Sequence, residues 1–362
     1  MDGAVAYMSS PGNVELRRYE LPEPEPGGVL AKVRCANICG SEVHIFSGHH
    51  PILKQAELGH EMIGEVLALG EGVTTDSAGR PLAVGDRIAP VYFITCMRCR
   101  ACARGQPFLC QHAYDWWIRP PDDWPHFHAT LATHYYLHPE QHFYRVPENV
   151  PDAVASVANC ALSQVLFGLD RAAISFGETV LVQGAGGLGL CAVAVARERG
   201  ARVIVIDGVD SRLELAAKFG ADEVLDLRAV PTVTERVAHV TAWSDGGVDV
   251  AVEVAGVPDA FSEGIRHIRP GGRYVELGNI IPGPTTPFDP GLYTRRSVTI
   301  YAVNRYDPWY LDTALQFLSR VHDRYPFGDL TGETFPLSAV DAALARSADR
   351  TVARAMIVPD RA

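Results

Sequence analysis

Residues 179–189 read Thr-Val-Leu-Val-Gln-Gly-Ala-Gly-Gly-Leu-Gly and set the architecture expected for the second half of the chain. The run Thr179–Gln183 predicts a buried strand, and the pattern Gly184-x-Gly186-x-x-Gly189 follows it where a helix is expected to begin. The first glycine permits a tight turn, the second lets the backbone approach a pyrophosphate, and the third allows close packing of helix on strand. A purely structural glycine turn is the alternative, but the strand–turn–helix context favours a dinucleotide site. The predicted cofactor contacts in this loop are Gly184, Gly186, Gly187, Leu188 and Gly189.

An acidic residue follows the next predicted strand. Asp207 comes directly after the predicted strand Arg202–Ile206. A carboxylate at this position can accept hydrogen bonds from the ribose hydroxyls and would repel a 2′-phosphate, so NAD is predicted over NADP. Arg212 lies five residues further on, and three interpretations of it stay open: a contact with the ribose edge, acceptance of a 2′-phosphate, or a solvated helix residue.

Strands and helices alternate from residue 179 onward, which predicts an α/β fold with a doubly wound parallel sheet. The predicted strands are 179–183, 202–206, 223–225, 248–252, 272–277 and 297–302, and the predicted helices are 153–173, 188–199, 211–219, 232–242, 259–268 and 309–320. The first 90 residues instead contain short strands with Gly and Pro turns, which suggests a β-barrel-like unit. Irregular loops are expected over residues 100–144, which are rich in His and Trp. The tail to residue 357 is expected to return to the first domain.

Length and charge narrow the class of protein. A chain of 362 residues favours two domains. The formal net charge of −11 argues against a nucleic-acid or anionic-membrane partner. Met1–Ser10 has no features of a secretion signal, and no run reaches the 18 apolar residues of a membrane span. We therefore expect a soluble, cytoplasmic protein, in which the eight cysteines are metal ligands or buried thiols rather than disulfides.

Four cysteines lie close together in the spacing C-x2-C-x2-C-x7-C. Four thiolates spaced in this way fit a closed, tetrahedral Zn²⁺ site, which clips a lobe of the chain together and does not catalyse. An iron–sulfur cluster and a chance grouping of unrelated thiols are the alternatives. The four residues are Cys96, Cys99, Cys102 and Cys110.

A second group of reactive residues is dispersed. The stretch Cys39-Gly-Ser-Glu-Val-His44 places a thiol, a hydroxyl, a carboxylate and an imidazole within six residues, on what we expect to be a surface loop. Alone, Cys39 can be a nucleophile, a metal ligand, a redox thiol or a buried residue. Together with His60 and Cys160 it would provide two thiolates and an imidazole with a fourth position open, the arrangement of a catalytic zinc. Spacing alone does not join these three residues, and each can also be a core residue.

The chain resembles the zinc-dependent medium-chain dehydrogenases/reductases of the alcohol dehydrogenase family over essentially its full length. The motifs that carry the resemblance are the zinc signature Gly59-His60-Glu61-x2-Gly64-x5-Gly70-x2-Val73, Gly85-Asp86-Arg87, the four-cysteine lobe, the glycine loop and Ile268-Arg269-Pro270-Gly271-Gly272. The resemblance implies a GroES-like, β-rich catalytic domain at 1–160 and 303–362, with a structural-zinc lobe at 96–110. It also implies an NAD-binding Rossmann domain at 161–302 and an active site between the two domains.

The resemblance also implies two Zn²⁺ ions per chain, one structural, at the four-cysteine lobe, and one catalytic. Cys39, His60 and Cys160 match the ligands of the catalytic zinc. Glu61 matches a carboxylate that lies near the metal or ligates it transiently. Glu42 stands where the family usually has an Asp that orients the zinc-binding histidine.

Three further residues receive roles from the same resemblance. Ser41 matches the hydroxyl that takes up the proton of the alcohol, and His44 matches the outer end of that proton relay. Arg354 falls where the family places a cation that binds the pyrophosphate. By position in the family, Tyr92 and the segment around Trp116 and Trp117 are also expected to approach the substrate. The alternative is that these aromatic residues pack under the zinc lobe or at a subunit contact.

The function expected from these residues is an NAD-dependent, zinc-containing oxidoreductase of class EC 1.1.1.-. It would transfer a hydride between NAD(H) and a small alcohol, aldehyde or ketone, with a primary or secondary alcohol or a polyol as substrate. A homodimer or homotetramer is expected, with no nucleic-acid or membrane partner. The alternatives are a zinc-free enone or quinone reductase of the same superfamily, disfavoured by the three zinc-ligand candidates, and a catalytically silent dinucleotide-binding scaffold, disfavoured by the relay residues.

Overall fold

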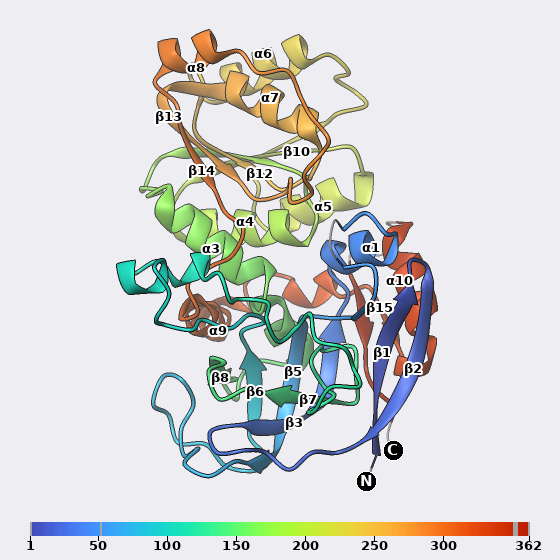
Figure 1. The fold of residues 1–362 in the computed structure, drawn as a ribbon. Helices are drawn as coiled ribbons and strands as arrows, with labels where there is room; N and C mark the ends of the chain where they lie inside the picture. Colours follow the sequence, from blue (N-terminus) through green and yellow to red (C-terminus); the bar gives the residue numbers. More distant parts are fainter. Residues whose placement is uncertain (1, 51–52, 350–353, 361–362) are drawn as a thin grey trace. The chain divides into compact units, whose positions relative to one another are not determined.

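The computed structural model describes residues 2–50, 53–349 and 354–360, and the chain divides into two compact units (Figure 1). Unit 1 comprises Met1–Ser163 and Asp307–Ala362, and unit 2 comprises Gln164–Tyr306. The C-terminal segment therefore rejoins the unit that the N-terminal half builds.

Unit 1 is built mainly from β-strands. Its larger sheet has the order β15-β16-β3-β5-β6-β8, with β7 also paired to β3, and its smaller sheet has the order β2-β1-β4. The larger sheet consists of β3 (Val29–Asn37), β5 (Glu61–Leu69), β6 (Arg87–Pro90), β7 (His134–Leu137), β8 (Phe143–Arg145), β15 (Glu333–Phe335) and β16 (Ala355–Ile357). The smaller sheet consists of β1 (Asp2–Ser10), β2 (Asn13–Glu20) and β4 (Ala56–Glu57). Buried apolar residues from both sheets, such as Met8 and Met62, share one core, which confirms the β-rich, GroES-like unit.

Unit 2 is a parallel sheet with helices on both faces. The strand order β11-β10-β9-β12-β13-β14 is that of a doubly wound dinucleotide-binding fold, and every pairing is parallel. The strands are β9 (Thr179–Gln183), β10 (Arg202–Asp207), β11 (Glu223–Asp226), β12 (Val248–Glu253), β13 (Ile268–Glu276) and β14 (Thr299–Ala302). Helices α4 (Gly187–Glu198) and α5 (Asp210–Lys218) cover one face, and α6 (Val233–Trp243) and α7 (Pro258–His267) cover the other (Figure 1). The predicted Rossmann sheet is confirmed.

The single helix predicted over residues 153–173 is wrong, because the chain bends there. Helix α2 (Asp152–Ala155) continues as a 3₁₀ turn (Ser156–Ala158), and α3 (Ala161–Arg171) leaves at 42°. At the break, the Ser163 hydroxyl donates to the carbonyl of Ala158 (2.6 Å) and the Asn159 side-chain amide donates to that of Pro90 (2.9 Å). These polar contacts replace helical hydrogen bonds and leave Cys160 at the bend.

Other local predictions also need correction. The segment after Cys39, expected to be a surface loop, forms helix α1 (Gly40–Phe46), and Glu42 within it is fully buried. The loop-rich stretch 100–144 contains β7 and the start of β8. Helices α8 (Pro290–Arg296) and α10 (Val340–Ala348) were not predicted, whereas the helix predicted near 309–320 is α9 (Tyr310–Val321).

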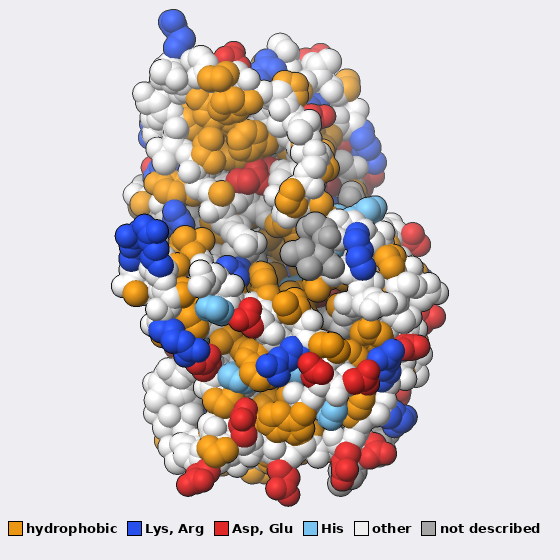
Figure 2. Space-filling view, in the orientation of Figure 1, with side chains coloured by type: hydrophobic (Ala, Val, Ile, Leu, Met, Phe, Trp, Pro, Cys, Tyr) orange, Lys and Arg blue, Asp and Glu red, His pale blue; other side chains and the backbone are white. Residues whose placement is uncertain are grey.

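Charged side chains of both signs are interspersed on the face drawn in Figure 2, where Lys and Arg residues are scattered rather than gathered in one patch. Among the described residues, no single helix is long and apolar enough to cross a membrane. The bent pair Asp152–Ala158 and Ala161–Arg171 together meets the length and composition test for such a span.

Candidate active site and metal centres

Cys39 lies at the junction of β3 and α1, buried at the N-terminal end of the helix. The Glu42 carboxylate reaches back and accepts a hydrogen bond from the backbone N–H of Cys39 through Oε2 (2.9 Å). An acid in the first helical turn stabilises the unsatisfied N–H groups there, and this contact also fixes the backbone that carries the thiol.

His60 enters the same site from the start of β5. Gly59 before it has φ +101°, and a Cβ there would lie 2.5 Å from the backbone nitrogen of Leu131, so only glycine fits. The other oxygen of Glu42, Oε1, bonds to His60 Nδ1, and both side chains are buried. This contact sets the tautomer and leaves Nε2 available to a metal, as the resemblance implied for the acid at position 42.

Four potential ligands converge at one point. The ligand atoms of Cys39, His60, Glu61 and Cys160 all lie within 4.8 Å of one another, and all four residues are buried. Glu61 Oε2 pairs with the Arg354 guanidinium, whereas Oε1 is buried without a hydrogen-bond partner in the described part of the chain and lies 3.8 Å from His60 Nε2. Two thiols, an imidazole and an unsatisfied carboxylate oxygen are a donor set that suits Zn²⁺.

The thiols influence each other strongly. Hydrogen bonding to Cys160 holds the pKa of Cys39 well below its ordinary value, although burial acts in the opposite direction. The same contact, together with burial, raises the pKa of Cys160. Burial also raises the pKa of Glu61 to about 7, against the effect of Arg354. The surroundings thus favour ionisation of Cys39 over that of Cys160.

Sequence reasoning missed Asn37, which belongs to this cluster. Its side-chain amide donates to Ser156 Oγ (2.9 Å) and to Glu61 Oε2 (3.4 Å). Asn37 is the register partner of Glu61 across β3 and β5, so only knowledge of the strand register would have revealed it.

The predicted relay residues both lie on α1. Ser41 is half-buried and His44, three residues later, is exposed. The ring of His44 is 6.2 Å from that of His49. Ser41 thus lies in the first turn of α1, next to Cys39, and His44 lies about one turn later, in the last turn.

The four-cysteine lobe forms a second cluster in unit 1. The sulfurs of the four residues lie within 4.8 Å of one another. Backbone N–H groups point at them: that of Cys96 donates to Cys110 Sγ (3.4 Å), and that of Cys99 donates to Cys96 Sγ (3.3 Å). Backbone N–H groups of Cys102 and Gln111 lower the pKa of Cys99 to about 6. These contacts favour the thiolate of Cys99, whereas burial raises the pKa of Cys102 to about 12 and raises that of Cys110 as well. The donor set of four cysteines fits a closed Zn²⁺ site.

The glycine loop of unit 2 connects β9 to α4. Gly184 has φ +100°, and a Cβ on Gly189 would lie 1.9 Å from the carbonyl oxygen of Gly184, so both need to be glycine for the fold. A Cβ on Gly186, at the N-terminus of α4, would meet no protein atom within 4 Å. The open space at Gly186 therefore leaves backbone N–H groups accessible to a phosphate.

The Asp207 carboxylate is hydrogen-bonded to the same glycine loop. Its carboxylate accepts hydrogen bonds from the backbone N–H groups of Ala185 (2.7 Å), Gly208 (2.7 Å) and Val209 (2.9 Å). Arg212 lies nearby, with Nη1 3.9 Å from Asp207 Oδ2. The acid thus ties the glycine loop to the end of β10.

Aromatic rings surround the imidazole of His60. The ring centroid of Tyr92 lies 4.9 Å from that of His60, and the ring centroid of Trp117 lies 5.6 Å from it. Trp116 instead contacts the Arg119 guanidinium, 3.6 Å from its ring centroid, and the ring of His138, whose centroid lies 3.9 Å away at a tilt of 35°. Of the two adjacent tryptophans, Trp117 is therefore the one that packs on the predicted metal ligand.

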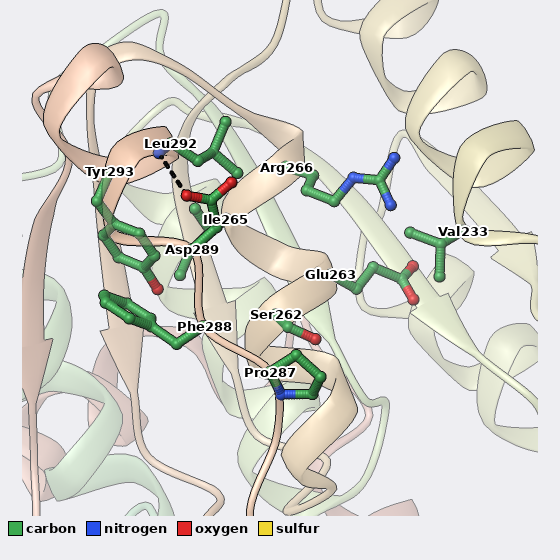
Figure 3. Close-up of a pocket in the computed structure, with 10 residues that line it drawn as sticks. All are labelled: Val233, Ser262, Glu263, Ile265, Arg266, Pro287, Phe288, Asp289, Leu292 and Tyr293. Atoms are coloured by element: carbon green, nitrogen blue, oxygen red, sulfur yellow. Dashed lines mark hydrogen bonds between the residues drawn. The ribbon is translucent and has the colours of Figure 1, made fainter.

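A pocket of about 390 Å³ lies on unit 2, between α7 and the segment that leads into α8 (Figure 3). Phe288 and Leu292 contribute apolar surface, and Asp289 caps α8 by accepting from the Leu292 N–H (3.2 Å). Glu263 is held by Arg236 through two hydrogen bonds of 2.6 and 2.7 Å. The hydrogen bonds of these two acids are structural, and the pocket shares no residue with either cysteine cluster.

Comparison with known proteins agrees with this geometry. Residues 25–148 match the family described as "Alcohol dehydrogenase GroES-like domain", and residues 187–320 match "Zinc-binding dehydrogenase". The chain is 34% identical to the 5-exo-hydroxycamphor dehydrogenase of Pseudomonas putida over 348 residues, 94% of each chain. It is 34% identical to the L-threonine 3-dehydrogenase of Pyrococcus horikoshii over 320 residues, 84% of this chain and 85% of the other.

Solved structures show the same fold. An alcohol dehydrogenase from Thermotoga maritima superimposes with a TM-score of 0.92 at 29% identity, over 99% of this chain and 100% of the other. These comparisons give no support to a zinc-free reductase or to a silent scaffold.

Proposed function

The chain belongs to the zinc-dependent, medium-chain alcohol dehydrogenase family, and from this premise we propose that it oxidises an apolar secondary alcohol with NAD as the hydride acceptor. The family membership makes it an oxidoreductase that acts on small alcohols with zinc and NAD(P). The substrate class, the cofactor preference and the residue roles below are our proposals.

The observation that carries the substrate proposal is the packing of Tyr92 and Trp117 around His60. Two aromatic rings beside a metal ligand offer an apolar surface to whatever binds there, and a charged amino acid would lose its hydration against them. The relatives named above are dehydrogenases of hydroxycamphor and of L-threonine. The aromatic surface favours a substrate of the first kind.

We assign the metal ligands as follows. Cys39, His60 and Cys160 would hold the catalytic zinc, and Glu61 would stay close to it, with its second oxygen neutralised by Arg354. Glu42 would keep the imidazole oriented through His60 Nδ1. When bound, zinc supplies Lewis acidity at the substrate oxygen and nicotinamide exchanges a hydride with the substrate carbon.

The proton of the alcohol needs a path to solvent. Ser41, half-buried near the thiol of Cys39, would take up that proton through its hydroxyl. His44 is exposed on the same helix and would pass it outward. The aromatic rings around His60 would exclude water from the reacting atoms.

The proposed preference for NAD rests on Asp207. Its carboxylate holds the glycine loop with three backbone hydrogen bonds, and its negative charge would repel a 2′-phosphate. Gly186 would let the backbone approach the pyrophosphate, and Arg212 would contact the ribose edge. Arg354 would contact the pyrophosphate, as the family resemblance implies, while its guanidinium stays paired with Glu61.

A second, structural zinc would occupy the four-cysteine lobe, giving two ions per chain. A reducing compartment, such as the cytoplasm, is supported by the eight cysteines, none of which forms a disulfide with another described residue. A homodimer or homotetramer is proposed from the family, and light scattering of the purified protein measures it.

A substrate screen tests the function. The zinc-loaded enzyme is given secondary alcohols with ring frameworks, primary alcohols, polyols and L-threonine, with NAD and NADP in parallel, and NADH or NADPH absorbance is followed. We expect kcat/KM for ring-bearing secondary alcohols to exceed that for L-threonine by about a hundredfold, the scale on which unpaired polar groups are rejected. L-threonine as the best substrate, or a preference for NADP, would overturn the corresponding part of the proposal.

A further inference from the structure

The side chain of Trp117, which packs against His60, carries a polar atom that is unpaired among the described residues. The indole Nε1 of Trp117 is buried and makes no hydrogen bond to any of the residues that the structure describes. The indole packs against the rings of His60 (5.6 Å between centroids) and Tyr114 (5.7 Å), and against the core of unit 1. The ring that carries the unpaired donor therefore packs beside a predicted metal ligand.

A buried indole N–H normally has an acceptor, because leaving it unpaired costs stability. Phenylalanine would supply the same kind of apolar surface without that cost. The presence of a donor at this point of an otherwise aromatic wall is thus best explained by a ligand that brings an acceptor.

Resting on the proposed function, we propose that Trp117 donates a hydrogen bond to a second oxygen of the substrate. The preferred substrate would then be an apolar secondary alcohol that also carries a neutral acceptor, a ketone or ether oxygen, away from the reacting carbon. Trp117 would be a specificity-determining residue for this oxygen.

The charges nearby favour a neutral acceptor over a carboxylate. Arg119 lies over the ring of Trp116, and the Arg354 guanidinium is paired with Glu61. An indole N–H can only donate a hydrogen bond, so Trp117 selects for a substrate oxygen that can accept one.

A matched pair of alcohols tests the inference. One is 5-exo-hydroxycamphor, a bicyclic keto-alcohol, and the other is the same bicyclic alcohol without the ketone. Both are assayed with the zinc-loaded wild type, with Trp117→Phe and with the control Trp116→Phe, and zinc content is measured for each protein.

In the wild type, we expect kcat/KM to be about tenfold or more higher for the keto-alcohol, the scale of one buried hydrogen bond. Trp117→Phe should remove this preference by slowing the keto-alcohol alone, with zinc retained. Trp116→Phe should keep the preference. If Trp117→Phe lowers kcat/KM equally for both alcohols, or if the wild type shows no preference, the inference is wrong and Trp117 provides apolar contact only.

Binding separates this inference from the proposed function. The affinity of both alcohols for the zinc-loaded enzyme saturated with NADH is measured by calorimetry, which requires no turnover. If neither alcohol is oxidised, the proposed function fails, but a tenfold affinity preference that Trp117→Phe removes would still support the donor. Equal affinities in the wild type would overturn the donor whatever the turnover.

Discussion

The two cysteine clusters of unit 1 use similar atoms but are assembled in opposite ways. The lobe cluster takes all four thiols from residues 96–110, and its sulfurs accept hydrogen bonds from backbone N–H groups of the same segment. The other cluster gathers its groups from residues 39–160, and side chains such as Glu42, Asn37 and Arg354 hold them in place.

We expect this difference to separate a structural site from a reaction centre. A local, all-thiolate site is closed and serves stability, because every ligand position is taken by the segment it folds. The dispersed site mixes thiols, an imidazole and the Glu61 carboxylate, whose Oε1 accepts no hydrogen bond from the residues that the structure describes. Such a donor set suits a metal that must also bind a substrate. The five predictions below test whether the clusters separate function from stability in this way.

The largest effect is expected from Cys39→Ser. Loss of a thiolate ligand should lower kcat by more than about 10³-fold, beyond the 10- to 100-fold typical of losing a residue that only orients a ligand. Metal analysis should show one zinc fewer per chain, while NADH binding, followed by fluorescence, survives in unit 2. Undiminished turnover would show that the dispersed cluster is not the reaction centre.

Ser41→Ala should lower the rate of the reaction without removing zinc. Removal of the hydroxyl should lower kcat about a hundredfold, the lower range for a group that transfers a proton. Zinc content and melting temperature should stay at the wild-type values. Ser47→Ala, at the other end of α1, serves as the matched control. A rate unchanged by Ser41→Ala would remove this residue from the proton path.

Cys99→Ser should have the opposite profile to Cys39→Ser. The lobe should lose its zinc, and the free energy of unfolding should fall by about 3 kcal/mol, among the larger effects of a single substitution. Turnover per folded molecule should stay within a few-fold of the wild type. Cys35→Ala, which changes a buried thiol outside both clusters, should keep both zinc ions. Loss of turnover at full stability would contradict the comparison.

Glu42→Gln tests how far the dispersed cluster depends on its supporting side chains. The amide keeps the shape but removes the charge next to His60 Nδ1, so zinc affinity or kcat should fall 10- to 100-fold. Glu42→Asp keeps the charge on a shorter arm, which cannot readily reach both His60 and the Cys39 N–H, and should cost less. Chelator competition measures the affinity. Equal behaviour of Glu42→Gln and the wild type would make the contact incidental.

The smallest effect concerns Glu57, three residues before His60. Its carboxylate accepts from the N–H groups of His128 and Ala129, and burial raises its pKa from 4.5 to about 8. The folded chain keeps a proton that the unfolded chain releases between these two values, so stability should fall as the pH rises from about 4.5 to about 8.

Glu57→Gln can still accept hydrogen bonds but has no proton to lose. Between pH 5 and pH 8, the free energy of unfolding should therefore fall less in this variant than in the wild type, by on the order of 1–3 kcal/mol. Denaturant unfolding at these two pH values measures the difference. Glu65→Gln, on the half-exposed side of β5, should leave the pH profile as in the wild type. Parallel profiles for Glu57→Gln and the wild type would assign the pH dependence to other groups.

The same contrast explains what the sequence revealed. The glycine loop, the four cysteines and the alternation of strands and helices in unit 2 are local patterns, and each predicted its structure directly. Cys39, His60 and Cys160 could be joined only through a family resemblance, because strand register and the bend before α3 bring them together. Asn37 was not predicted for the same reason, because no neighbouring residue in the sequence indicates its contact with Glu61.

The incorrect secondary-structure predictions have a related cause. Over residues 153–173 the apolar pattern is continuous, and the break depends on polar contacts with Pro90, far away in the chain. Helix α1 follows Cys39 because the Glu42 carboxylate satisfies the N–H at its start, a contact that propensity does not encode.

The backbone hydrogen bonds of Asp207 limit how this enzyme can be redesigned. Exchanging the acid at the end of β10 for a small neutral residue is an obvious route for a protein engineer who wants NADP-driven chemistry. Here the same carboxylate accepts from three backbone N–H groups, one of them in the glycine loop. No neutral side chain offers two such oxygens, so replacing Asp207 would loosen the glycine loop, and a successful design would need to rebuild that loop first.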